Sequence, residues 1–225
     1  ATRYIYIGYA NTVIRTVPGI AVSIFMTFTL AYPLSKRSLP FRKGVTVLLA
    51  LTMFFSGGLI PTYLLVRGLG LIDNRLVFLF IHLISPFHVF LLRNFIMRIP
   101  ASFEESALID GAGRLRILTR IIIPLSRPVQ AVLILWLAML HWNSWFDAMI
   151  YTPAASLMTL QLYLRNILVE QMLFEEFTSG TGKADVFAYS IEAVNILLAI
   201  IPVVLLYPFI QKYFVKAAYA GAVRN

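Results

Sequence analysis

Long uncharged apolar runs constrain this chain more than any other feature of its sequence. A helix needs about 20 mainly apolar residues to cross the hydrocarbon core of a bilayer. Five stretches approach or exceed that length, namely Thr16–Ser35, Gly44–Val66, Leu76–Leu92, Ile121–Phe146 and Val186–Gln211. None of them shows the two-residue alternation of a membrane-spanning strand. The sequence therefore predicts an all-α polytopic helix bundle with five transmembrane spans, in a single domain over residues 1–225.

The composition of the chain points to the same solvent. Apolar residues make up 60% of the chain and charged residues 13%, with a mean hydropathy of +0.82. Soluble domains are closer to half apolar and a quarter charged. The net charge of +9 does not indicate a nucleic-acid partner, because the basic residues form short clusters between the apolar runs. The chain has no cysteine, which excludes disulfides and thiolate metal sites.

The positions of Lys and Arg predict the orientation of the bundle. Cytoplasmic loops of membrane proteins carry an excess of basic residues. Thirteen of the 19 lie after the first run, between the third and fourth runs, and in the C-terminal tail. We therefore expect the C-terminus and the segment 99–128 to be cytoplasmic and the loop 147–185 to be external. An odd number of spans with an external start also predicts a further helix before residue 1.

Small residues and proline interrupt the second run at Ser56, Gly57, Gly58 and Pro61. Such residues kink or unwind a transmembrane helix when neighbouring groups satisfy the freed backbone. One interpretation is close helix packing through small residues. The other is a bend that shapes a translocation path.

The segment 99–128 is too polar to span a membrane and too patterned to be a loose linker. Ser102 precedes Glu105 by three residues, the spacing of a capping box at a helix start. Gly111 stands where a helix favours a left-handed residue at its end. A second short helix is predicted over Arg114–Ile123, before Pro124. The pattern by itself fits either a contact for a soluble partner or an interfacial helix pair.

This segment resembles the EAA loop of binding-protein-dependent ATP-binding-cassette (ABC) importers. The family pattern reads here as Glu105-Ser106-Ala107-Leu108-Ile109-Asp110-Gly111, followed by Ile122-Ile123-Pro124. Ser106 and Ile123 depart from the usual Ala and Leu. Asp110-Gly111-Ala112 and Leu125-Ser126-Arg127-Pro128 match the carbohydrate-importing, maltose-transporter-like branch. Further similarity at residues 54–63, 69–73, 142–147 and 207–214 extends the resemblance over nearly the whole chain, to the LplC/YtcP-type subgroup associated with complex or acidic oligosaccharides.

The resemblance implies a type I importer permease with six helices, of which the first would be missing here. The chain would form half of the path for a carbohydrate delivered by an extracytoplasmic solute-binding protein. Its other partners would be a homologous second permease and two ATP-binding cassette subunits. Those subunits would bind ATP and Mg, so this chain would be no enzyme and hold no cofactor. The complex would lie in the bacterial cytoplasmic (inner) membrane.

The resemblance also implies which residues couple the permease to ATP hydrolysis. In the family, the EAA helix docks in a groove of the ATPase subunit, whose closure switches the permease between inward-facing and outward-facing states. The coupling residues carried over are Glu105, Ser106, Ala107, Asp110 and Gly111.

Other residues that could carry chemistry lie at the ends of the predicted spans. Trp142, Asn143, Trp145 and Asp147 follow the fourth run and form either an interfacial aromatic belt or a contact for sugar or binding protein. Glu192 lies inside the fifth run and either lines a cavity or bonds a neighbouring helix. The three histidines, His82, His88 and His141, lack metal-ligand spacing, so we expect packing and hydrogen bonding.

Two other classes of membrane protein compete with the importer interpretation. A membrane-embedded enzyme would need a catalytic or metal-binding motif, and no HExxH or phosphate-binding glycine loop is present. An ion-coupled carrier would need a relay of paired charged groups within the spans. Only Glu192 qualifies as a member of such a relay, and a single residue does not make a pair.

Overall fold

The computed structural model describes residues 2–178 together with residues 197 and 204. Every regular element within residues 2–178 is a helix, in agreement with the predicted all-α class. The fifth predicted run, Val186–Gln211, lies outside the described residues except for those two positions.

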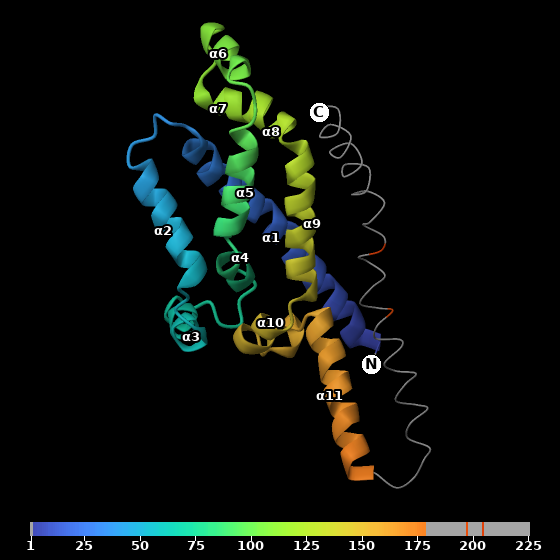
Figure 1. The fold of residues 1–225 in the computed structure, drawn as a ribbon. Coiled ribbons are helices and arrows are strands. Elements are labelled where there is room, and N and C mark those ends of the chain that lie inside the picture. The colour runs from blue at the N-terminus through green and yellow to red at the C-terminus, as the bar shows by residue number, and fades with distance from the viewer. Residues whose placement is uncertain (1, 179–196, 198–203, 205–225) are drawn as a thin grey trace.

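Helix α1, Thr2–Ser35, is the element on which the others pack. It contacts α5, α9 and α11 (Figure 1). At 1.5 Å per residue its 34 residues span about 50 Å, which exceeds the roughly 30 Å of a hydrocarbon core. The predicted run Thr16–Ser35 is therefore the C-terminal part of a longer helix, which also carries Arg15.

The second predicted run is two helices, α2 (Arg42–Phe54) and α3 (Leu59–Gly68), bent by 113° at the break between them. Gly58 adopts a positive φ of 81°, and no other described residue has an atom within 4 Å of the position its Cβ would take. The glycine therefore serves the backbone turn at this break. The predicted interruption at this point is confirmed, as a break.

The third predicted run is also divided, into α4 (Val77–Ile81) and α5 (Pro86–Ile96). The single helix expected over Leu76–Leu92 is therefore wrong. Pro86 explains the break, because proline lacks an N–H and fits the first turn of a helix. Ser85 is extended, and its carbonyl accepts the N–H of Val89 at 3.1 Å as α5 begins.

The fourth predicted run bends by 80° between the segment Arg114–Leu125 and helix α9, Arg127–Asn143. The straight part of this span thus begins at Arg127 and not at Ile121. The N–H of Ser126 reaches the carbonyls of both Ile122 and Ile123, at 2.9 and 3.2 Å, where the chain turns. The segment before the bend consists of α7 (Arg114–Ile117), a π-helical turn (Leu118–Ile122) and α8 (Ile123–Leu125).

The remaining elements lie at the two ends of the bundle. Helix α6, Ser102–Ile109, projects at one end, and α3 and α10, Phe146–Tyr151, lie at the opposite end (Figure 1). The described part of the predicted external loop is largely helical, with α10, a 3-10 turn (Ala155–Leu157) and α11 (Leu160–Thr178).

The predicted count of five spans is not confirmed. In the part of the chain that the structure describes, one helix, Arg3–Ser35, is long and apolar enough to cross a membrane. The count rises to three if each of the two bent pairs forms one span. The main buried cluster joins α1, α5, α7 and α9 through side chains that include Phe28, Leu34, Leu92, Ile117 and Leu133.

Candidate functional site

Helix α6 presents apolar side chains away from the body of the protein. No residue of this helix is buried, and Ile109 at its end is 87% exposed. Phe103, Leu108 and, just beyond the turn, Leu115 are also exposed. Large apolar side chains grouped on a projecting element mark a contact surface for another molecule. Ala107 is the exception, because it packs back against the main buried cluster.

The end of α6 is a Schellman turn. The N–H of Gly111 donates to the carbonyl of Leu108 at 3.0 Å, and the N–H of Ala112 donates to the carbonyl of Ala107 at 2.8 Å. Gly111 adopts a φ of 77°, as expected for the left-handed residue of this motif. The predicted role of Gly111 in the turn is confirmed.

The start of α6 differs from the predicted capping box. The residue before the helix is Ala101, whose carbonyl accepts the N–H groups of Glu104 and Glu105, both at 3.0 Å. Ser102 already lies inside the helix and makes no side-chain cap, so that prediction is wrong. Pro100 displaces the helix start by one residue, because its carbonyl begins the first turn with the N–H of Phe103 at 3.3 Å.

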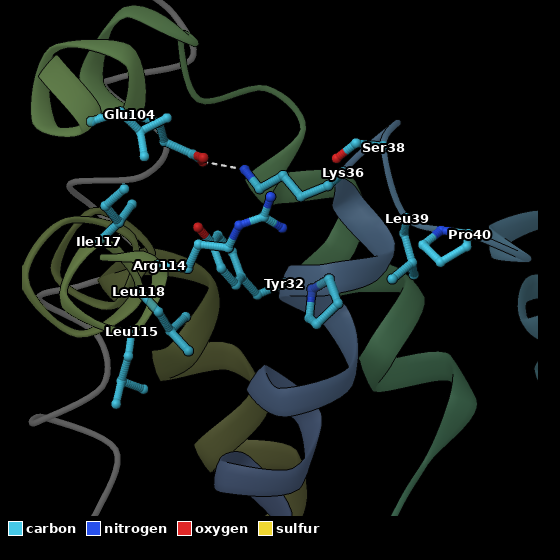
Figure 2. A pocket seen from close by; sticks show the side chains of 12 residues that line it. Tyr32, Lys36, Ser38, Leu39, Pro40, Glu104, Arg114, Leu115, Ile117 and Leu118 are labelled. Carbon is cyan, nitrogen blue, oxygen red and sulfur yellow. Dashed lines mark hydrogen bonds and ion pairs between the residues drawn. The ribbon is translucent and has the colours of Figure 1, made fainter. Parts of the chain in front are cut away.

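A side-chain ion pair ties α6 to the end of α1. The ammonium of Lys36 contacts the carboxylate of Glu104 and lies 4.7 Å from the centre of the Tyr32 ring (Figure 2). Both charged side chains are partly buried. Together with Arg114 they border an open groove of about 450 Å³ between α1, α6 and α7. The ion pair therefore links α6 directly to the end of α1.

A buried polar cluster lies toward the opposite end of the bundle. The guanidinium of Arg15 on α1 pairs with both carboxylate oxygens of Asp147 on α10, with Nη1 to Oδ1 at 2.9 Å. The two side chains are only 1% and 9% exposed. His82 Nε2 lies 3.1 Å from Oδ2, the Ser144 hydroxyl contacts Oδ1, and the N–H of Ala148 donates to Oδ1 at 2.8 Å.

These contacts keep Asp147 ionised. Burial alone would raise the pKa of this carboxyl group. The hydrogen bonds from His82 and Arg15, together with the positive charge of Arg15, outweigh burial and hold the pKa well below its usual range. The cluster is a neutralised ion pair that fastens α10 and the break after α4 onto α1.

A fourth titratable side chain, His141 on α9, packs beside this cluster. Its ring meets that of His82 edge-on, with 5.4 Å between the ring centres. A Cβ placed on Gly19 of α1 would lie 2.6 Å from Nε2 of His141. Glycine at this position therefore allows α9 to pack this closely on α1. Neither nitrogen of His141 has a hydrogen-bond partner among the described residues, and no metal-binding group of three side chains occurs among them.

The structure does not bring the residues predicted for the substrate path into one site. Trp142 is buried and packs with Leu160 and Leu164, whereas Asn143 is exposed. Trp145 is half-buried with the Arg165 guanidinium 4.3 Å above its ring, and Asp147 belongs to the buried ion pair. Glu192 lies outside the described residues. A role of these residues in transport stays a prediction.

Sequence reasoning missed Arg15, Lys36 and Glu104 as functional candidates. Arg15 is one of the six basic residues outside the three predicted cytoplasmic segments, and it directly precedes the uncharged run Thr16–Ser35. A charge at the edge of a span requires a partner, and Asp147 is an acidic residue at the end of the fourth run. That pairing was the available signal.

These features define a class of protein. Long and broken apolar helices with irregular backbone between helix halves are typical of membrane transport proteins. Helix α6 projects from one end of this bundle. Comparisons with known proteins make the class specific. No protein-family model matches the chain.

Individual relatives match over almost its entire length. The polygalacturonan/rhamnogalacturonan transport system permease protein YtcP of Bacillus subtilis is 39% identical over 100% of this chain and 79% of its own length. Protein LplC of the same organism is 38% identical over 93% of this chain and 71% of its own. The chain belongs to the permease subunits of carbohydrate ABC importers.

A solved structure supports the same assignment. A bacterial ABC transporter involved in the import of the acidic polysaccharide alginate contains a chain that superposes with a TM-score of 0.83. The two chains are 38% identical, and the match covers 94% of this chain and 75% of that one. The protein is therefore a non-catalytic, inner-membrane subunit of an ABC transporter complex.

Proposed function

We propose that this chain forms half of the translocation path for an oligosaccharide, including acidic ones. The substrate arrives from an extracytoplasmic solute-binding protein, and a homologous second permease supplies the other half of the path. Two ATP-binding cassette subunits bind ATP and Mg and drive the cycle. Support comes from relatives named for polygalacturonan, rhamnogalacturonan and alginate, which are acidic or partly acidic polysaccharides.

The observation that carries this proposal is the exposed helix α6 with its Schellman turn. Ile109 is the most exposed side chain of the helix and would enter the groove of the ATPase subunit, whereas Leu108 lines the protein's own groove beside α1. Ala107 faces inward, so its small side chain serves the packing of α6 on its own permease. Glu105, Ser106 and Asp110 are exposed on the same short helix or its end, within reach of the ATPase.

Closure of the ATPase dimer would then move α6 as a rigid piece. The Lys36–Glu104 ion pair passes this movement to α1, and the continuous segment from α7 to α8 passes it to α9. ATP binding thus biases one membrane element between inward-facing and outward-facing states. Because the ATPase subunits are cytoplasmic, this proposal places α6 and the C-terminus on the cytoplasmic side of the membrane and α10 and α11 on the external side.

Gly111 offers the sharpest test of the coupling role. Among the described residues nothing lies within 4 Å of the position of an added Cβ, so within that part of the chain a substitution strains the backbone at φ 77° and meets no neighbouring side chain. A left-handed β-branched residue costs about 1–2 kcal/mol, whereas asparagine tolerates this conformation. We expect Gly111→Val to leave the complex assembled while uptake and substrate-stimulated ATP hydrolysis fall together, and Gly111→Asn to retain most of both. Normal uptake by the valine variant would contradict the proposal.

The buried charges near Arg15 are the one observation that favours an ion-coupled carrier. Asp147 pairs with Arg15, however, and a neutralised pair cannot bind and release an ion without first separating. Uptake into proteoliposomes separates the two functions. Uptake by an ABC importer requires ATP inside the vesicles and does not depend on an imposed proton gradient. Uptake by an ion-coupled carrier requires the gradient and does not depend on ATP.

A further inference from the structure

Several buried polar atoms beside the Arg15–Asp147 pair have no partner. In the described part of the chain, six buried side-chain nitrogen or oxygen atoms make no hydrogen bond. Four of them belong to three residues where α1 meets α9, namely Nε of Arg15, Oγ1 of Thr16 and both ring nitrogens of His141. A buried polar atom without a partner is costly, so this concentration in one place calls for a purpose other than stability.

The contact between α1 and α9 places these three residues close together. The imidazole of His141 lies against Gly19, where an added Cβ would be 2.6 Å from Nε2. Arg15 and Thr16 precede Gly19 by four and three residues, so they lie on the same face of α1. Nη1 of Arg15 also lies 3.5 Å from the carbonyl oxygen of Ser144, directly after α9. The imidazole is therefore about one helical turn along α1 from the unpartnered atoms of Arg15 and Thr16.

The unpartnered atoms are complementary as donors and acceptors. A neutral imidazole has one nitrogen that accepts a hydrogen bond and one N–H that donates. The Nε–H of Arg15 can donate to the first nitrogen of His141, and the hydroxyl oxygen of Thr16 can accept from the second. Arg15 can keep Asp147 at the same time, because its terminal nitrogens hold that carboxylate, with Nη1 to Oδ1 at 2.9 Å.

The chain has a joint that allows α9 to move while Asp147 stays paired with Arg15. Residues 144 and 145 are not helical, and they separate α9 from α10, which carries Asp147. Non-helical residues between two helices can absorb such a movement. At its other end, α9 follows the segment that leads from α6 through α7 and α8. A slide of α9 by less than one turn, about 5 Å, would carry His141 from Gly19 toward Arg15.

We propose that His141 is a positioning residue of the transport cycle, which hydrogen-bonds to Arg15 and Thr16 in the second conformational state of the permease. With His141 against Gly19 these atoms are unpaired, and after the slide they are paired. The new hydrogen bonds favour the second state and so make the contact between α1 and α9 bistable. The inference rests on the proposed function, because closure of the ATPase dimer supplies the movement of α9.

The test compares polar and apolar replacements in the assembled complex, in proteoliposomes that enclose ATP, with oligogalacturonate and oligoalginate as probes. His141→Leu and Thr16→Val should each lower the maximal uptake rate about 5-fold or more, the effect of one lost hydrogen bond on an equilibrium. The KM should stay the same, and the thermal midpoint without ATP should not fall, because the state with His141 against Gly19 loses no hydrogen bond. His141→Gln and Thr16→Ser keep polar atoms and should retain most of the rate.

Thr159→Val and His88→Leu are the matched controls. Within residues 2–178, Oγ1 of Thr159 is also buried and unpartnered, but it lies directly before α11, and His88 stacks on Trp136. Both controls should keep the wild-type rate. Wild-type rates in both His141→Leu and Thr16→Val, or equal losses in the controls, would overturn this inference and leave the proposed function intact. Absence of ATP-dependent uptake of both probes by the wild type would contradict the proposed function, and this inference with it.

Discussion

The Arg15–Asp147 pair should be a large single contributor to the stability of this protein. Both side chains are almost fully buried, and the guanidinium meets the carboxylate with two nitrogens. Removing one partner of such a pair costs about 3–5 kcal/mol, because it leaves an uncompensated buried charge. The two single variants should differ, since the partners have different remaining contacts.

Arg15→Met should lie near the lower limit of that range. It leaves Asp147 with the contacts from His82, Ser144 and the N–H of Ala148. Asp147→Leu should lie near the upper limit, because Arg15 would keep only a long contact with the Ser144 carbonyl and the Phe78 ring, and its Nε has no partner among the described residues even in the intact cluster. The double variant removes both charges and should cost less than the sum by about 2 kcal/mol or more, which a double-mutant cycle measures.

Unfolding in detergent, followed by far-UV circular dichroism, gives these free energies. A loss of 3 kcal/mol corresponds to a fall of about 6–12 °C in the midpoint for a chain of this size. Arg67→Met is the matched control, because Arg67 is exposed at the same end of the bundle and should change stability by less than about 0.5 kcal/mol. Additive single effects, or single effects no larger than the control, would refute the reasoning.

Two further perturbations address other contacts of the same fold. Reversing the charge of Lys36 or of Glu104 alone should reduce uptake. The loss of stability should be at most about 1 kcal/mol, because the pair is partly exposed. Reversing both charges should restore uptake, and failure to do so would contradict transmission through the pair. Gly19→Ala should destabilise the protein by about 1–3 kcal/mol, because its Cβ would overlap His141. In a His141→Ala background the same substitution should cost less. Equal destabilisation by Gly19→Ala in the wild type and in the His141→Ala variant would place the strain elsewhere.

The sequence predicted the features that depend on local chemistry. Apolar runs longer than a bilayer's hydrocarbon core predicted helices, and helices occupy the described parts of the first four runs. The left-handed turn at Gly111 was predicted correctly, because φ above zero is a local property that favours glycine. The interruption at Ser56–Pro61 was predicted from its cluster of small residues and proline, although its 113° bend was not.

The features that the sequence did not predict depend on distant residues or on competition between local signals. Arg15 and Asp147 are 132 positions apart, and Lys36 and Glu104 are 68 apart, so neither pair follows from spacing. The capping box failed because Pro100 starts the helix one residue early. The break before Pro86 was missed because proline can either kink a membrane helix or begin a new one.

Cross-linking at the tip of α6 tests the central claim most directly. The chain has no native cysteine, so Ile109→Cys introduces a single thiol at an exposed position of the proposed coupling helix. With a short thiol-to-amine reagent, the account predicts a covalent product with the ATPase subunit whose yield changes when ATP binds. Ile60→Cys, at a position 73% exposed at the opposite end of the bundle, should give no such product. Absence of an ATPase adduct at Ile109, or an equal yield from both positions, would contradict the account.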